Sequence, residues 1–167
     1  MRSEDRRLNR FIPLQIIMCR YRFMLVLVFG MMVSLASGKD HGQVDLSAYQ
    51  WKNRLLILFA PSEDDRVYQS FKEQLQKRAQ EIRDRNLLIF HVFESGEGRL
   101  DDLSLNKEQA RSLRKRFSIK MGQFKLILIG KDGEVKFQGE LPVELSDIFS
   151  IIDAMPMRQR EIRERSK

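Results

Sequence analysis

The sequence predicts an α/β fold with the order β-α-β-α-β-β-α: a four-stranded mixed sheet with helices on both faces. Two short runs, Leu55 to Phe59 and Leu87 to Phe93, are apolar on both sides, which is typical of strands buried between layers. A segment of helical period separates them, so the three elements form a right-handed parallel crossover. Gly130 to Gly133 then reads as the turn of an antiparallel hairpin.

The first strand stops at Ala60-Pro61 and an acidic segment follows. Ser62 is suited to cap a helix, with Asp65 three residues on at a capping-box-like spacing. We expect this helix to run from about Asp64 to Arg83, and we expect Trp51 to pack under the first strand. The apolar stripe of the helix consists of Val67, Phe71, Leu75, Ala79 and Ile82.

A polar loop is expected from Glu94 to Leu103. A second helix follows, capped by Asn106 with Gln109 three residues on. Phe124 to Ile129 is the third strand. Glu134 to Gln138 is an edge strand that buries Val135 and Phe137 on one face. Pro142 suits the first turn of the closing helix, and Pro156 ends or kinks it. The buried stripe of that helix is Leu145, Ile148, Phe149, Ile152 and Met155.

Charge and cysteine content exclude several classes of function. The net charge is +7, but six arginines and two acids within residues 1–38 contribute +4, which leaves +3 for the remainder. That remainder mixes both signs, so we expect no nucleic-acid partner. The single cysteine is Cys19, so no disulfide, thiol nucleophile or cysteine-based metal site is expected after residue 38.

Residues 1–38 are expected to be a signal peptide, with Met18 as an alternative true start. Arg20 and Arg22 precede an apolar segment, Phe23 to Ala36, and small residues follow it. About 14 apolar residues are short for a membrane span. The chain is therefore expected to be exported, to a periplasm or to the outside. The alternative is that this segment stays uncleaved as an anchor, which would be the only expected contact with a membrane. Residues 39–51 would be a linker, 52–155 the folded domain and 156–167 a basic tail, exposed as a helical extension or frayed.

Three stretches carry a resemblance to known proteins: LILFAPSEDDR, FSIKMGQFKLILIGKDGEVKFQG and the closing helix resemble thioredoxins and peroxiredoxins. RLLILFAPS, KDGEVK and DAMPMRQRE resemble more closely a thioredoxin-like domain of unknown function. That domain occurs alone in exported bacterial proteins and also in vertebrate extracellular-matrix and sushi-repeat proteins, the group that includes equarin. The resemblance spans about residues 47–163 and implies a thioredoxin-like fold and export, but no reaction.

The redox residues of thioredoxins are absent from this sequence. Thioredoxins place two cysteines at the start of the first helix, where the helix dipole lowers the thiol pKa. Here Glu63 and Arg66 stand nearest those positions. The family's cis-proline is also missing, because Met121-Gly122-Gln123-Phe124 precedes the third strand. Dithiol exchange and cysteine-peroxidase chemistry are therefore excluded after residue 38.

The candidates for binding are Gln123 and the segment Ser62, Glu63, Asp64, Asp65 and Arg66. The acids of that segment offer oxygen ligands but lack the spacing of a calcium loop, so we expect no metal and no cofactor. His91 is the only plausible base for a Ser62 nucleophile, yet its apolar strand favours a satisfied core or rim residue. A basic side on the second helix indicates either a solvated face or a site for an anionic surface: Arg111, Arg114, Lys115 and Arg116.

The leading hypothesis is a non-catalytic, exported binding or scaffold module of the cell envelope, with an unknown envelope or extracellular protein as its partner. The alternative is a thiol-independent enzyme, or an atypical oxidoreductase-like protein, that uses polar groups at the start of the first helix. The basic tail could also serve as a partner-binding arm.

Overall fold

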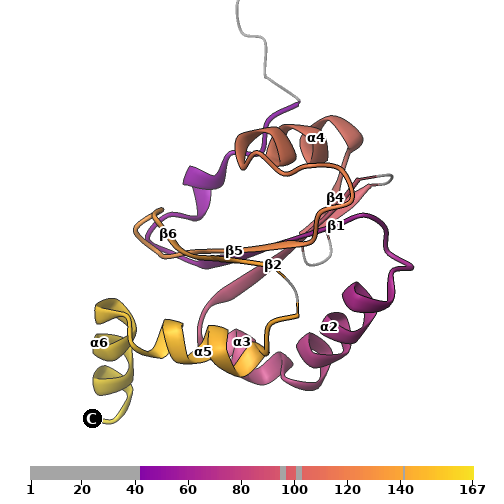
Figure 1. Ribbon diagram of the computed structural model, residues 1–167. Coiled ribbons are helices and arrows are strands. Elements are labelled where there is room, and N and C mark those ends of the chain that lie inside the picture. The colour runs from indigo at the N-terminus through magenta and orange to yellow at the C-terminus, as the bar shows by residue number, and fades with distance from the viewer. Residues whose placement is uncertain (1–41, 95–96, 101–102, 141) are drawn as a thin grey trace, which may run out of the picture. The chain divides into compact units, whose positions relative to one another are not determined.

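The computed structural model describes residues 42–94, 97–100, 103–140 and 142–167 (Figure 1). The described strands are β1 (Arg54–Ala60), β2 (Leu87–Phe93), β3 (Gly98–Leu100), β4 (Leu103–Leu105), β5 (Lys125–Ile129) and β6 (Val135–Gly139). The helices are η1 (Leu46–Tyr49, a 3-10 turn), α2 (Arg66–Lys77), α3 (Ala79–Asp84), α4 (Lys107–Arg116), α5 (Leu145–Asp153) and α6 (Pro156–Arg165). None of these helices is long and apolar enough to cross a bilayer. The expected signal peptide lies outside the described residues.

β1 is the central strand, and helices cover both faces of the sheet (Figure 1). It runs parallel to β2 and antiparallel to β5, as the sequence predicts. Because side chains alternate along a strand, Leu56 and Leu58 join the core under α2, α3 and α5, while Ile57 and Phe59 join the core under α4 and η1. All seven residues of β1 are buried, which explains why the run carries no polar alternation.

The sheet has six strands, not the four that we predicted. Its order is β4-β3-β2-β1-β5-β6, so the extra strands extend the β2 edge. β3 lies in the segment expected to be a polar loop and pairs antiparallel with β2, whereas β4 begins where that segment ends and pairs with β3. Strands of three residues are too short to show a period in the sequence, and their pairing with the β2 edge forms them.

The first helix departs from the prediction at its start and in its middle. The N-cap is Asp65, not Ser62: the Asp65 carboxylate accepts a hydrogen bond of 2.7 Å from the Val67 backbone N–H. The helix also breaks at Arg78, whose backbone turns to φ −114° and ψ 27°. The Arg78 side chain there pairs with Glu81 at 2.7 Å. The predicted continuous helix is therefore two helices, α2 and α3.

Three single-residue predictions are corrected by the packing. Trp51 does not lie under the first strand; it is 64% exposed and adopts a positive φ of 65°. Val135 is 43% exposed, because β6 forms the outer edge of the sheet and only Phe137 packs partly against the core. Pro142 precedes the closing helix, whose N-cap is Glu144.

The last residues form α6, with Pro156 at its first turn, rather than a frayed end. Buried ion pairs hold this helix to the start of the sheet. Arg54 is only 1% exposed, and its guanidinium donates two hydrogen bonds of 3.2 Å to the Glu161 carboxylate. Lys131 approaches the same carboxylate at 2.8 Å, and buried Arg158 pairs with Asp84. Glu161 thus pairs with Arg54 and Lys131, while Arg165 of the same helix pairs with Asp84.

Candidate functional site

The candidate segment Ser62–Arg66 links the carboxyl end of β1 to α2. This edge of the parallel strands β1 and β2 is where α/β folds commonly place their sites. A turn brings the chain from Pro61 to the cap residue Asp65. The Glu63 carbonyl accepts a hydrogen bond of 2.6 Å from the Gln69 amide, so the turn is tied back to α2.

Glu63 is the centre of an ion-pair cluster. Its Oε1 lies 3.0 Å from Lys72 Nζ on α2 and 2.5 Å from Arg99 Nη2 on β3. The hydrogen bond from Lys72, and then the charge of Arg99, lower the pKa of Glu63, so this carboxylate is ionised at neutral pH. Two cations, one from α2 and one from β3, therefore hold Glu63, which stands near the position of a cysteine in thioredoxins.

Tyr68 and His91 adjoin this ion pair on the inner side. Tyr68 is fully buried, and its hydroxyl lies 3.1 Å from His91 Nδ1. Burial, followed by the charges of Arg99 and Lys72, lowers the pKa of His91 to about 4. Burial also raises the pKa of Tyr68. Both side chains are consequently neutral at pH 7.

We call these five residues the Glu63 cluster: Glu63, Tyr68, Lys72, His91 and Arg99. Three of them line one end of an open groove of about 770 Å³ that continues along α3 and β2. A general base works best with a pKa near the operating pH, and neither titrating group of the inner pair meets that condition. His91 binds Tyr68, as a satisfied residue would, and no described hydrogen bond joins it to Ser62.

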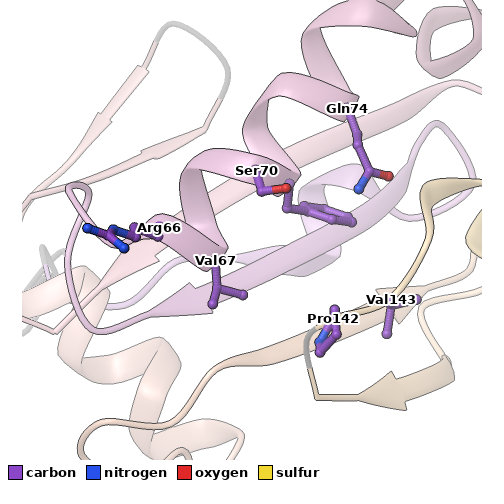
Figure 2. A pocket seen from close by; sticks show the side chains of 7 residues that line it. Arg66, Val67, Ser70, Gln74, Pro142 and Val143 are labelled. Carbon is purple, nitrogen blue, oxygen red and sulfur yellow. The ribbon is translucent and has the colours of Figure 1, made fainter.

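A second hollow, of about 270 Å³, lies on the other side of α2 (Figure 2). Val67, Phe71, Pro142 and Val143 supply its apolar walls. Val67 is 40% exposed, which is high for an aliphatic side chain in the first turn of a helix that also packs on the core. Polar groups stand around it: Arg66, Ser70 and Gln74, of which Gln74 accepts a hydrogen bond of 3.2 Å from the Leu145 N–H.

The other predicted residues are spread over different surroundings. Asp65 is used as the cap, Asp64 is exposed, and Arg66 lies beside the hollow shown in Figure 2. The pairing of Phe59 with Lys125 places Gln123 at the same edge of the sheet as Ser62. Gln123 itself binds Glu140 at 3.0 Å and the Lys120 N–H at 3.1 Å, and no described hydrogen bond links it to the Ser62–Arg66 segment. The predicted residues therefore do not converge on one centre.

Sequence reasoning missed Tyr68, Lys72 and Arg99. The helical spacing in α2 and the alternation along β2 could have indicated some of these contacts. Tyr68 and Lys72 are four residues apart and so share a face of α2, and His91 shares the Leu87 and Ile89 face of β2. Arg99 gave no signal, because it lies on a strand that forms only by pairing with β2.

The described residues contain no group of three potential metal ligands among His, Cys, Asp and Glu. The three consecutive acids explain this finding. Asp65 bonds to the Val67 backbone, Glu63 is bound by two cations, and Asp64 is exposed. A cation at this turn would have to displace both Lys72 and Arg99.

Comparison with known proteins identifies both family and fold. The family described as Domain of unknown function (DUF4174) matches residues 45–161. Sushi repeat-containing protein SRPX2 of Xenopus laevis is 31% identical over 114 residues, which are 66% of this chain and 25% of that protein. Coiled-coil domain-containing protein 80 of Danio rerio is 24% identical over 133 residues, which are 70% and 15% of the two chains. The chain thus spans a quarter or less of these relatives.

Two solved structures share the fold at low identity. The reduced 2-Cys peroxiredoxin of Plasmodium vivax has a TM-score of 0.52 and 17% identity, covering 70% of this chain and 85% of that one. Thioredoxin peroxidase I of Plasmodium yoelii has a TM-score of 0.54 and 18% identity, covering 70% and 80%. These matches establish a thioredoxin-like α/β fold with a mixed sheet.

Proposed function

The chain belongs to the family described as Domain of unknown function (DUF4174), and we propose that it acts as an exported, non-catalytic binding module of the cell envelope. One observation carries this proposal. At the edge where a thioredoxin holds its thiols, this chain holds Glu63, whose charge is bound by Lys72 and Arg99. Pairing with two cations makes a carboxylate a weaker nucleophile, which supports a structural role for Glu63.

The protonation states of the neighbouring groups support a non-catalytic role. A general acid or base contributes most when its pKa lies near the working pH. His91, with a pKa lowered to about 4 by burial, remains a neutral acceptor for the Tyr68 hydroxyl. The charged members of the Glu63 cluster are one carboxylate, Glu63, and two cations, Lys72 and Arg99, which both bind it.

We choose the hollow beside α2 that Val67, Phe71, Pro142 and Val143 line, called the α2 hollow from here on, as the binding surface. It combines exposed apolar groups, Val67 and Pro142, with a cation, Arg66, that has no described partner. A hollow of about 270 Å³ has room for one large side chain. Its chemistry suits an apolar side chain next to a carboxylate on a partner protein, because Arg66 would pair with the acid while Val67 and Phe71 contact the apolar group.

Export is supported by the sequence of the first 38 residues and by the resemblance to sushi-repeat proteins. Basic, apolar and small residues follow one another there in the order of a secretory signal. The match to a sushi repeat-containing protein agrees with this setting. We therefore expect the partner to be an envelope or extracellular protein.

Site-directed photocrosslinking in the native cell tests the binding role. A photoreactive residue at Val67 should give a discrete adduct, and the same residue at Val135 is the matched control. Both valines are about equally exposed, at 40% and 43%, but Val135 lies on the far edge strand β6. Adducts of equal yield at the two positions, or none at Val67, would refute the proposed surface.

The alternative function, a thiol-independent enzyme, has its own test. It would depend on Ser62, Glu63 or Asp65, so alanine replacements there should abolish a cellular phenotype of the gene if it is correct. Glu63→Gln separates the two functions more sharply than Glu63→Ala, because it keeps the shape of the side chain and removes the charge. A phenotype that survives Ser62→Ala and Glu63→Gln in folded protein would eliminate the enzyme.

A further inference from the structure

The face of the sheet that α4 covers, opposite to the face under α2, carries an open hollow of about 560 Å³ beside α4. Its walls are the end of β2, the exposed side of α4 and the loop that follows this helix. Four cations line it, Lys107, Arg111, Arg114 and Lys115, against a single acid, Glu94. Among the described residues, no acidic partner is found for Lys107, Arg111 or Lys115. The hollow therefore has a strong excess of positive charge.

The spacing of these three cations is unfavourable for the helix itself. Lys107, Arg111 and Lys115 follow one another at intervals of four residues, so like charges are stacked along one face of α4. Lys107 is also the first residue of the helix, where the positive end of the helix dipole repels a cation. An anion placed against this face would relieve both repulsions.

Arg114 supplies the second, independent observation. It is only 9% exposed. Its Nη2 donates a hydrogen bond of 2.7 Å to the Lys120 carbonyl and a longer one, of 3.4 Å, to Glu94. Its Nη1 is buried and has no hydrogen-bond partner. Buried donors are nearly always paired, so this unpaired donor can still bind a water molecule or an ion.

Glu94 does not supply that acceptor. Its Oε2 accepts the Gly122 N–H at 2.7 Å, and the same oxygen is the one that Arg114 Nη2 approaches. These contacts hold the loop after α4 against the guanidinium and fix the position of Arg114. Arg114 is therefore held in the lining of the basic hollow, with one buried donor left unpaired.

We propose that this hollow binds a compact tetrahedral oxyanion, a phosphate or sulfate group. Arg114 is the inner donor, and Arg111 and Lys115 contact the anion from the rim. A guanidinium fits such a group well, because its planar donors match two oxygens at once. This site is separate from the α2 hollow, since α4 and α2 cover opposite faces of the sheet (Figure 1).

The test is a titration of the purified chain with sodium phosphate or sodium sulfate against sodium chloride at equal ionic strength, followed by amide NMR shifts. We expect saturable shifts at Gly122 and Arg111 with the two oxyanions only. Arg111→Gln should weaken phosphate binding about tenfold, the loss of one charge-assisted hydrogen bond. Arg116→Gln is the matched control, since this cation of α4 does not line the hollow, and it should change the affinity less than about twofold.

A second arm identifies the source of the anion. Phosphatidylcholine vesicles with and without phosphatidic acid present the same phosphate group on a membrane. Binding to the acidic vesicles that Arg111→Gln weakens would assign the site to a lipid headgroup, whereas binding of free phosphate alone would assign it to a soluble anion. Shifts that do not saturate, that chloride reproduces, or that Arg111→Gln and Arg116→Gln reduce equally would overturn the proposal.

Discussion

His91 should make the stability of this protein fall as the pH drops from 7 towards 4. The imidazole is held neutral by burial, and its pKa is lowered from 6.5 to about 4. In the unfolded chain it takes up a proton near its ordinary pKa. Between the two values the unfolded state binds more protons than the folded state, so the free energy of unfolding decreases as the pH falls.

The magnitude follows from the same two pKa values. A difference of about 2.5 pKa units at 1.36 kcal/mol each corresponds to about 3 kcal/mol, fully present above pH 6.5 and lost by about pH 4. By about pH 5 the loss should have reached about 2 kcal/mol. The acids add to the loss only at the lower end of this window: Glu63, whose pKa is lowered from 4.5, loses its contribution as the pH falls below that value.

The assay is urea unfolding followed by far-UV circular dichroism at a series of pH values. His91→Gln removes the titrating group and should flatten the dependence between pH 6.5 and 4.5. The chain has only two histidines, and His41 is present in both proteins, so a difference between the two slopes comes from His91. Only the slopes are compared, which makes the result independent of any change in absolute stability. Equal slopes for His91→Gln and the unmodified chain would refute the burial argument.

Two further predictions concern a buried ion pair and a helix cap. Glu161→Ala should destabilise the protein by about 3–5 kcal/mol, because Arg54, which is 1% exposed, loses its carboxylate partner. Glu164→Ala, on the exposed side of α6, should change the stability little. Equal urea midpoints for the two variants would argue against the buried pair. Asp65→Ala should lower the free energy of unfolding by about 1 kcal/mol through loss of the N-cap, while Asp64→Ala next to it should not; the reverse order would place the cap elsewhere.

The candidate site could be predicted only as a segment. The acidic stretch after the first strand is visible in the sequence, and Glu63 within it proved to be the centre of a charged cluster. Its partner Arg99 lies 36 residues away on β3, a strand too short to be recognised. The unpaired donor of Arg114 was equally invisible, because pairing within a folded chain depends on neighbours from the loop at Lys120 and from Glu94.

The sequence by itself determined the order of the main strands and helices and the family. Apolar runs and amphipathic periods reflect burial, which local composition records. What only the tertiary structure decided is why three matched motifs belong together. Arg54 of RLLILFAPS, Lys131 of KDGEVK and Glu161 of DAMPMRQRE meet in one buried ion-pair network. Charges become partners only when the sheet and α6 bring distant residues within 4 Å, and no local pattern encodes that distance.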